Sequence, residues 1–237
     1  MLSEYEGVED PSYLAEEENR LRNSARVVAA VERHRRPGTL FEVGASVGIL
    51  LEAARRRGWT VSGIEPSRWA VATGRHRYGV NLRQGTIEGD SGPNGPVDCV
   101  VMSDVLEHLI DPQGALLKAA GWLAPEGVLA IVTVNMTALL ARALGTRRPG
   151  YMDMHLTYFS PQALDSMFSR AGLTRIAMGT APRRLSAGYL GERLRGSGRL
   201  TDVAAQALRM PLVRRTTISL RSRDLLLVLG RRLAVHA

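Results

Sequence analysis

The chain has 237 residues, is 45% hydrophobic and carries a formal net charge of +8, which is typical of a globular protein and excludes a fibrous or wholly disordered chain. Its longest apolar runs, such as Val128–Val134, are much shorter than the roughly 20 residues that cross a bilayer. The acidic N-terminus lacks the features of a secretory signal, and the single cysteine, Cys99, cannot build a disulfide framework. We therefore expect one large domain in the cytoplasm.

The positive charge is concentrated near the C-terminus. Residues 181–237 contain 12 arginines but only three acidic residues, Glu192, Asp202 and Asp224. Such a segment can attract nucleic acid, an anionic membrane surface or a phosphorylated substrate, and a solvated arginine-rich surface explains it equally well. The pattern is that of a basic insertion at about residues 182–220, for which peripheral contact with an anionic membrane stays open.

Along the chain, the pattern of apolar residues predicts an α/β fold. Apolar positions between Ser12 and Arg35 recur at helical spacing and stop at Pro37, which indicates an amphipathic helix. After it, short apolar runs alternate with helical stretches such as Ile49–Arg57 and Trp69–Arg77, the pattern of a parallel sheet with helices on both faces. Strands are predicted at Thr39–Val43, Thr60–Ile64, Val80–Arg83, Asp98–Met102, Val128–Val134, Thr174–Met178 and Asp224–Leu229. We therefore predict a doubly wound, mostly parallel seven-stranded sheet of Rossmann-like type.

One further helix has clear end signals. Ser160 is placed to cap it, Pro161 occupies its first position, and Gly172 follows its end. Gly89–Pro96 reads as a turn-rich loop. These elements divide a single domain into an N-terminal helical segment (1–36), a cofactor-binding half (37–134) and an acceptor-side half (135–237).

The segment Phe41–Gly48 indicates the cofactor. It is an apolar strand that leads into two glycines, Gly44 and Gly48, and then into a predicted helix. Glycines allow a cofactor to approach the backbone closely, and the free amides at a helix N-terminus favour a carboxylate. A dinucleotide fingerprint would need glycines at the positions held by Ser46 and Ile49. A nicotinamide cofactor is therefore disfavoured.

A carboxylate follows at a characteristic distance. Glu65 ends the second predicted strand about 20 residues after the glycine turn, where an acidic side chain can accept hydrogen bonds from both hydroxyls of a ribose. This spacing is shared by proteins that bind NAD and proteins that bind S-adenosylmethionine, so the missing glycines decide between the two.

Several motifs together resemble those of class I S-adenosylmethionine-dependent methyltransferases, in both order and spacing. They are Glu42-x-Gly44-x-x-x-Gly48, Gly63–Ser67, Asp98–Leu109 and Leu123–Gly127. The resemblance covers roughly Thr39–Gly172. The sequence departs from the family in having Ala45-Ser46-Val47 between its glycines and Glu126 in place of a turn glycine.

The resemblance implies S-adenosyl-L-methionine as cofactor and assigns residues to each of its parts. Glu42 and the Gly44 backbone would hold the methionine end, and Glu65 the ribose. The other implied cofactor-binding residues are Ala45 and Gly48 of the glycine turn, Thr86 and Ile87 beside the adenine, and Ser103 and Asp104 near the sulfonium.

The motif His155–Pro161 resembles a subgroup that methylates small molecules, glycans and ubiquinone precursors. It implies a small-molecule or glycan acceptor, methylated at a hydroxyl oxygen. Removing the hydroxyl proton requires a base, and a histidine suits this role near neutral pH. His155 is the first candidate for the catalytic base and His108 the second. Tyr151, Asp153 and Tyr158 are near enough in sequence to share the site. No metal site is predicted.

Other functions remain as alternatives. An RNA methyltransferase could use the basic segment to bind phosphates, but residues 181–237 contain one aromatic residue, Tyr189, whereas single-stranded nucleic acids are usually bound by stacking on several. A non-catalytic cofactor-binding protein of the same fold is the other alternative, and the intact motif of Glu42 and Glu65 argues against it. The sequence does not indicate an oligomeric state.

Overall fold

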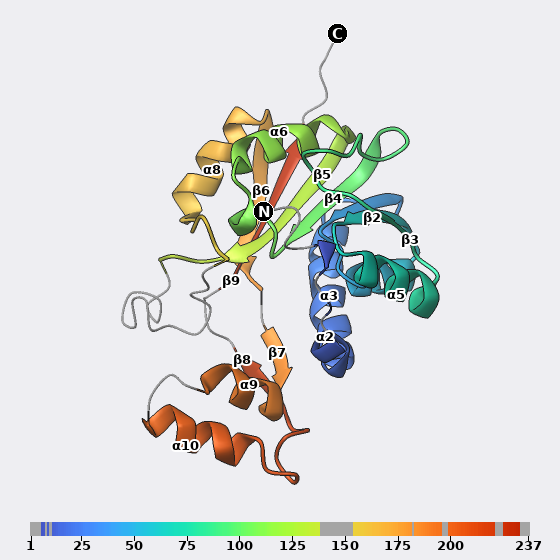
Figure 1. The fold of residues 1–237 in the computed structure, drawn as a ribbon. Coiled ribbons are helices and arrows are strands. Elements are labelled where there is room, and N and C mark those ends of the chain that lie inside the picture. Colours follow the sequence, from blue (N-terminus) through green and yellow to red (C-terminus); the bar gives the residue numbers. More distant parts are fainter. Residues whose placement is uncertain are drawn as a thin grey trace.

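The computed structural model describes residues 6–7, 9, 11–137, 154–181, 183–195, 199–220 and 225–232. Its centre is a seven-stranded sheet with the strand order β3-β2-β1-β4-β5-β9-β6 (Figure 1). Neighbouring strands are parallel except β9, which is antiparallel to both β5 and β6. The strands are β1 (Thr39–Val43), β2 (Thr60–Glu65), β3 (Asn81–Gln84), β4 (Val97–Ser103), β5 (Leu123–Val134), β6 (Leu173–Thr180) and β9 (Leu225–Arg232). The predicted mostly parallel, seven-stranded α/β fold is confirmed.

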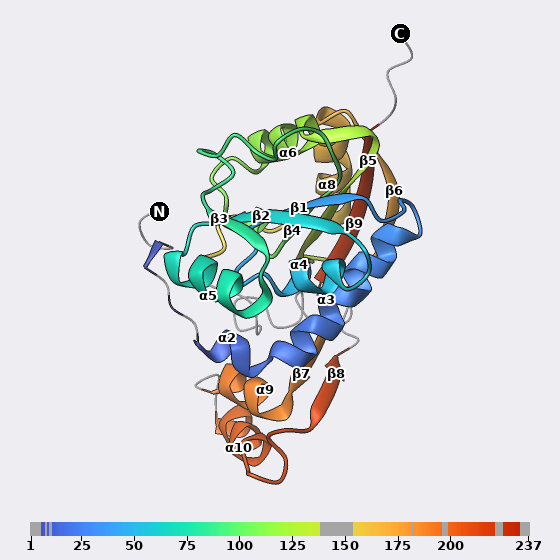
Figure 2. The ribbon, with the colours of Figure 1, turned by 90° about the vertical axis from the view of Figure 1, so that its right-hand side faces the viewer.

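Helices cover both faces of the sheet, as Figures 1 and 2 show. One face carries α3 (Glu17–Glu32), α4 (Ile49–Arg55) and α5 (Arg68–Tyr78), and the other carries α6 (Pro112–Gly121) and α8 (Pro161–Arg170). Two short elements stand near the ends of this arrangement: α2 (Pro11–Ala15), which precedes α3, and a 3-10 helix η1 (Leu106–His108), which follows β4. The sheet is therefore doubly wound.

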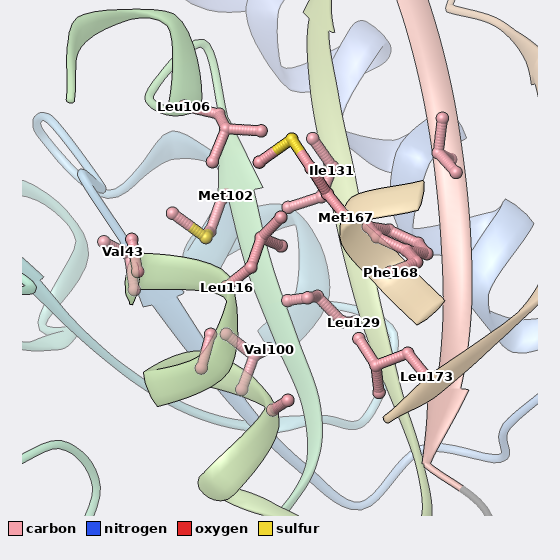
Figure 3. Close-up of a cluster of buried hydrophobic side chains, with 14 of the residues drawn as sticks. Val43, Val100, Met102, Leu106, Leu116, Leu129, Ile131, Met167, Phe168 and Leu173 are labelled. Atoms are coloured by element: carbon pink, nitrogen blue, oxygen red, sulfur yellow. The ribbon is translucent and has the colours of Figure 1, made fainter. Parts of the chain in front are cut away.

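The alternation of side chains along the strands supplies both halves of the core. In β4, Val100 and Met102 point toward α6 and α8, whereas Cys99 and Val101 point toward α3 and α4, because successive strand residues face opposite sides of a sheet. Figure 3 shows the half of the core that faces α6 and α8, in which Phe168 of α8 packs with residues of the strands. Cys99 is fully buried within this framework, as expected for a small apolar side chain.

The helix after Ser160 has the predicted ends. The Ser160 hydroxyl accepts a hydrogen bond from the Ala163 amide, and Gly172 has a φ of +69° just after the helix. The predicted N-terminal helix, in contrast, is divided into α2 and α3. The carboxylate of Glu16, between them, accepts hydrogen bonds from Asn19 in α3 and from the distant Ser186 amide.

The basic segment forms a small unit beside α3. It consists of a two-stranded antiparallel sheet, β7 (Arg183–Ser186) and β8 (Thr217–Leu220), and of the intervening helices α9 (Ala187–Leu194) and α10 (Arg199–Leu208). Figure 2 shows this unit at one end of the molecule, next to α2. The Asn23 amide group of α3 pairs with both backbone groups of Arg184, with N–O distances of 2.8 and 2.9 Å. The N-terminal helices and the inserted unit are thus joined.

Strand β5 begins earlier than the predicted Val128. It starts at Leu123, opposite Val97, and resumes regular pairing at Val128, so the residues between them bulge. Glu126 has a φ of +61° in this bulge. None of the helices in the described parts of the chain is both long and apolar enough to cross a membrane.

Candidate active site

A cavity of about 610 Å³ lies at the carboxyl ends of β1, β2 and β4. The order of the strands reverses direction at this point: β2 and β3 lie on one side of β1, whereas β4 and β5 lie on its other side. Such a switch point is where open α/β sheets bind their ligands. The walls are formed at the ends of the strands, by residues 42–46 of β1 and its loop, 65–66 at the end of β2, 85–88 after β3, and 103–105 and 108–111 at and after the end of β4, together with Tyr13, Arg20, Ser24 and Leu50.

The backbone fixes the carboxylate of Glu65 in this cavity. Its side chain is almost buried, and its two oxygens accept hydrogen bonds from the Ser46 amide at 2.8 Å and the Ser67 amide at 2.9 Å. Burial raises the pKa of Glu65, while these two amides oppose the shift. Each carboxylate oxygen can accept more than one hydrogen bond. Glu65 can therefore accept two further donors, as the neighbouring hydroxyls of a ribose require.

Glu42 provides a buried carboxyl group that lacks a full set of partners. The side chain is 3% exposed, and its Oε2 atom has no hydrogen-bond partner. Burial, followed by the neighbouring Glu65, raises the pKa of Glu42 well above its usual value. A cation beside Glu42 would oppose both effects, because it favours the charged form of a carboxyl group.

Glycines shape the wall of the cavity through their backbone. Gly44 has a φ of +68°, and a Cβ atom there would lie 2.4 Å from the Cγ2 atom of Val105. It is thus needed where the ends of β1 and β4 meet. Gly48 has a φ of +77° but lies outside the cavity lining, and its Cβ would lie 2.9 Å from Val80. Its visible role is therefore in packing.

The remaining predicted cofactor-binding residues all line the cavity: Ala45, Thr86, Ile87, Ser103 and Asp104. Ile87 is also part of the buried core, which holds its apolar surface in place. Ser46 and Asp104 have positive φ angles of 48° and 54°, a conformation that L residues seldom adopt and that is concentrated at functional sites.

Tyr13 of α2 and Arg20 of α3, together with Ser24, line the cavity and were not predicted from the sequence. The Arg20 guanidinium lies 3.6 Å from the ring centroid of Tyr13. Burial raises the pKa of the Tyr13 hydroxyl, and the charge of Arg20 opposes this shift. Neither residue belongs to a motif, and both reach the site only through the packing of α2 and α3, so no local sequence signal could have indicated them.

The two candidate histidines lie together beside the cavity. His108 lines it, whereas His155 is not among the lining residues and packs edge-to-face against His108, with ring centroids 4.7 Å apart. The amides of Leu156 and Thr157 donate to the Glu107 carbonyl at 2.8 and 3.2 Å, and this holds the segment in place. Tyr158 contacts His155, with centroids 5.5 Å apart. Tyr151 and Asp153 lie outside the described residues.

Hydrogen bonding defines the proton positions on His108. Its Nδ1 atom lies 2.9 Å from the Met154 carbonyl oxygen. Because a carbonyl oxygen can only accept, Nδ1 carries the hydrogen, and Nε2 of the neutral ring is the atom that can take up a proton.

Glu107 lies beneath the two histidines. It is fully buried, its Oε2 accepts a hydrogen bond from Thr133, and its Oε1 has no hydrogen-bond partner. Burial, with a smaller effect of Asp104, raises the pKa of Glu107 to about 7. One donor atom each from Glu107, His108 and His155 lie within 4.8 Å of one another. These are ligand types that can hold a divalent metal, an arrangement that the sequence analysis did not predict.

The cavity fits S-adenosylmethionine, which is cationic at its sulfur and its amino group. The unpartnered oxygen of Glu42 can receive an amino group, and the fixed carboxylate of Glu65 can receive ribose hydroxyls. The apolar side chain of Ile87 offers a surface for a base. A Rossmann-like fold with this site at its switch point is the arrangement expected of the class of S-adenosylmethionine-dependent methyltransferases.

Comparison with known proteins gives the family. The chain belongs to the methyltransferase-domain family, whose profile matches residues 14–177. Similar curated proteins are ubiquinone biosynthesis O-methyltransferases from Paramagnetospirillum magneticum, 36% identical over 105 residues, and from Caulobacter sp. strain K31, 33% identical over 104 residues. The match covers 42% of this chain and 42% of the first relative, and 41% of each chain for the second. It therefore spans about two fifths of each relative's length.

Solved structures show the same fold at low sequence identity. A magnesium protoporphyrin IX methyltransferase from Synechocystis PCC 6803 was solved with bound SAH (S-adenosylhomocysteine, the demethylated cofactor). It aligns over 95% of this chain and 89% of its own, with a TM-score of 0.60 and 14% identity. A putative methyltransferase from Bacillus halodurans aligns over 89% and 99%, with a TM-score of 0.64 and 13% identity. These structures confirm that the chain has the Rossmann-like fold.

Proposed function

We propose that the protein methylates a hydroxyl oxygen of a small-molecule or glycan acceptor, with the histidine pair taking up the hydroxyl proton. The observation that carries this proposal is the contact of His108 and His155 at the edge of the cofactor cavity. The similarity to O-methyltransferases of ubiquinone biosynthesis supports a hydroxyl acceptor of small size.

The residues that hold the cofactor follow from their positions. Glu42 binds the amino group, and Glu65 binds the ribose hydroxyls. Thr86 and Ile87 flank the adenine, while Ser103 and Asp104 lie near the sulfur. When bound, S-adenosylmethionine supplies a methyl group on a positively charged sulfur that a nucleophile can displace. The chain's contribution is to orient the acceptor, an effect worth roughly 7–11 kcal/mol in well-aligned reactions.

The proton is taken up by the histidine pair. His155 remains the first candidate for the base, and the defined tautomer of His108 gives that ring an acceptor nitrogen as well. Replacement of His155 by Ala should lower turnover by about 10²–10⁴-fold while SAH affinity stays nearly intact, because a base acts on the acceptor and not on the cofactor. His108→Ala is the comparison that assigns the proton to one ring. Near-normal turnover of both variants between about pH 6 and 9 would contradict a histidine base.

A metal control separates two roles for the same residues. Turnover of the purified enzyme is measured after treatment with a chelator and after addition of Mg²⁺, Mn²⁺ or Zn²⁺. Under the base proposal, turnover does not depend on the metal. Loss of turnover with the chelator and its return with one ion would instead make His155 a ligand together with Glu107.

The basic segment supports a second, separate proposal of contact with an anionic membrane surface. Leu212 is 93% exposed and Met210 53% exposed. Arg214 and Arg215 follow them in the sequence and are exposed, and Arg209, which precedes them, pairs with Glu192. Exposed apolar side chains beside cations are typical of interfacial segments. Cosedimentation with phosphatidylglycerol vesicles but not phosphatidylcholine vesicles is expected, with a loss for Leu212→Glu. Binding to single-stranded RNA in place of vesicles would favour the nucleic-acid alternative.

A further inference from the structure

A second cavity, of about 500 Å³, adjoins the cofactor cavity. It lies between α3 and the edge of the sheet formed by β5, β9 and β6, where Val132, Leu227 and Met178 contribute to its walls. Both cavities are lined by Tyr13, Arg20, Ser24, Leu50, Ser103 and Asp104. The two spaces therefore meet at the end of β4, close to where the reacting methyl group is expected.

The two cavities have opposite charge. Among the described residues, the second cavity is lined by four arginines, Arg20, Arg26, Arg33 and Arg183, and by a single carboxylate, Asp104. The cofactor cavity has the reverse composition, with one arginine and the carboxylates of Glu42, Glu65, Glu88, Asp104 and Asp111. The acidic cavity suits a cationic cofactor, and the basic one suits an anion.

The arginines of the second cavity have guanidinium groups available for a ligand. Within the described part of the chain, neither Arg26 nor Arg183 forms a side-chain hydrogen bond or an ion pair, and the buried Nε atom of Arg20 has no hydrogen-bond partner. Several arginines outside the second cavity are ion-paired, for example Arg35 with Asp98 and Arg77 with Glu17.

Part of the second cavity is apolar. Val27 of α3 and Leu229 of β9 are buried beside it, and Val132 of β5 is almost fully buried. A cavity with apolar walls and a few charged groups is typical of a site for a small organic molecule. The combination fits a ligand with an apolar body and an anionic group better than it fits inorganic phosphate alone.

We propose that this second cavity binds the methyl acceptor, and that the acceptor is a small amphiphilic molecule carrying a carboxylate or a phosphate. The proposal rests on the proposed methylation of a small molecule and names the chemistry of its substrate. Arg26 and Arg183 bind the anionic group, and the apolar residues of α3 and β9 bind the body. The acceptor hydroxyl passes the junction at Ser103 and Asp104 and enters the cofactor cavity, which His108 lines.

Binding of three probes of matched shape tests the proposal without requiring the true acceptor. Calorimetry is performed with 1-naphthoate, 1-naphthyl phosphate and the uncharged 1-naphthamide, at low ionic strength because salt screens exposed charges. At least one anion should bind about tenfold or more tightly than the amide, as expected for a charge-assisted hydrogen bond. The more tightly bound anion identifies the group as a carboxylate or a phosphate.

Variants locate the binding site. Arg26→Gln and Arg183→Gln should each remove most of the preference for the anion and leave amide binding unchanged. Arg183 is exposed, so its replacement does not threaten the fold. Arg22→Gln is the matched control, because Arg22 lies on the same helix α3 but is paired with Glu18 at the surface. This variant should bind all three probes like the unaltered protein.

Equal binding of the anions and the amide would overturn the proposal, as would an anion preference that survives in both Arg26→Gln and Arg183→Gln. SAH affinity is measured on the same preparations. Failure to bind SAH would count against the proposed function, whereas normal SAH binding without anion selectivity would refute only the assignment of the second cavity.

Discussion

Replacement of Glu65 by Ala should weaken SAH binding by about 10²–10⁴-fold. Glu65 is almost buried, and each of its two oxygens is already oriented by a backbone amide, from Ser46 or Ser67. The remaining acceptor capacity of the two oxygens is the feature assigned to the ribose hydroxyls. A hydrogen bond to a charged group contributes about 1.5–3 kcal/mol, so the loss of two amounts to about 3–6 kcal/mol. Each 1.4 kcal/mol corresponds to a factor of about ten in affinity.

Calorimetric titration with SAH measures this effect, and thermal unfolding checks that the variant is folded. Glu18→Gln is a suitable control, because Glu18 is an exposed carboxylate on α3 that pairs with Arg22 and does not line the cavity. A folded Glu65→Ala variant whose SAH affinity stays within about threefold of the unaltered protein would refute the assignment. The ribose would then lie elsewhere.

Two further changes test the neighbouring residues. Gly44→Ala should lower both SAH affinity and thermal stability, because the φ of +68° at this position is unfavourable for an L residue by roughly 1–2 kcal/mol and the added Cβ would contact Val105. Adding Val105→Ala to this variant should relieve the contact but not the backbone strain. A Gly44→Ala variant with unchanged affinity and stability would show that the turn tolerates a side chain. Glu42→Gln should gain stability relative to the unaltered protein as the pH rises, because the folded state raises the pKa of Glu42 and the ionised carboxyl therefore disfavours folding above its usual titration range. Unfolding temperatures from about pH 4 to pH 8 test this, and a stability difference that is constant or decreases with pH would contradict it.

The sequence indicates the strands well because each is a short apolar run between turn residues. Thr39–Val43 matches β1 from end to end, and Ser160 and Gly172 mark the ends of α8 correctly. Helix α6 was missed, although Asp111 accepts a hydrogen bond from Gly114 and Pro112 begins the helix. Its run of alanine and leucine has little polar contrast, so helical periodicity is weak there.

Long-range pairing explains the other differences in the fold. Strands β7 and β8 pair across about thirty intervening residues, and neither carries a strong apolar alternation. The early start of β5 depends on a bulge between Leu123 and Val128 that regular alternation does not reveal. Glu16, between α2 and α3, accepts a hydrogen bond from the Ser186 amide, a contact that no local pattern contains.

The candidate site was predictable in the parts that carry motifs. Glu42, Gly44 and Glu65 line one cavity because parallel strands place their carboxyl ends at the same edge of the sheet. The roles of Arg20 and Arg26 were not predictable, since they depend on how α3 packs against the sheet. The approach of His155 to His108 also depends on tertiary contacts, here the bonds of residues 156 and 157 to the Glu107 carbonyl.

A crystal structure of the protein with SAH would show whether the cavity at the switch point of the sheet holds the cofactor. We expect the ribose hydroxyls within hydrogen-bond distance of both Glu65 oxygens, the amino group beside Glu42, and the adenine between Thr86 and Ile87. The sulfur should face Ser103 and Asp104, where the second cavity begins. SAH bound in the arginine-lined cavity, or bound with Glu65 out of contact with the ribose, would contradict the account.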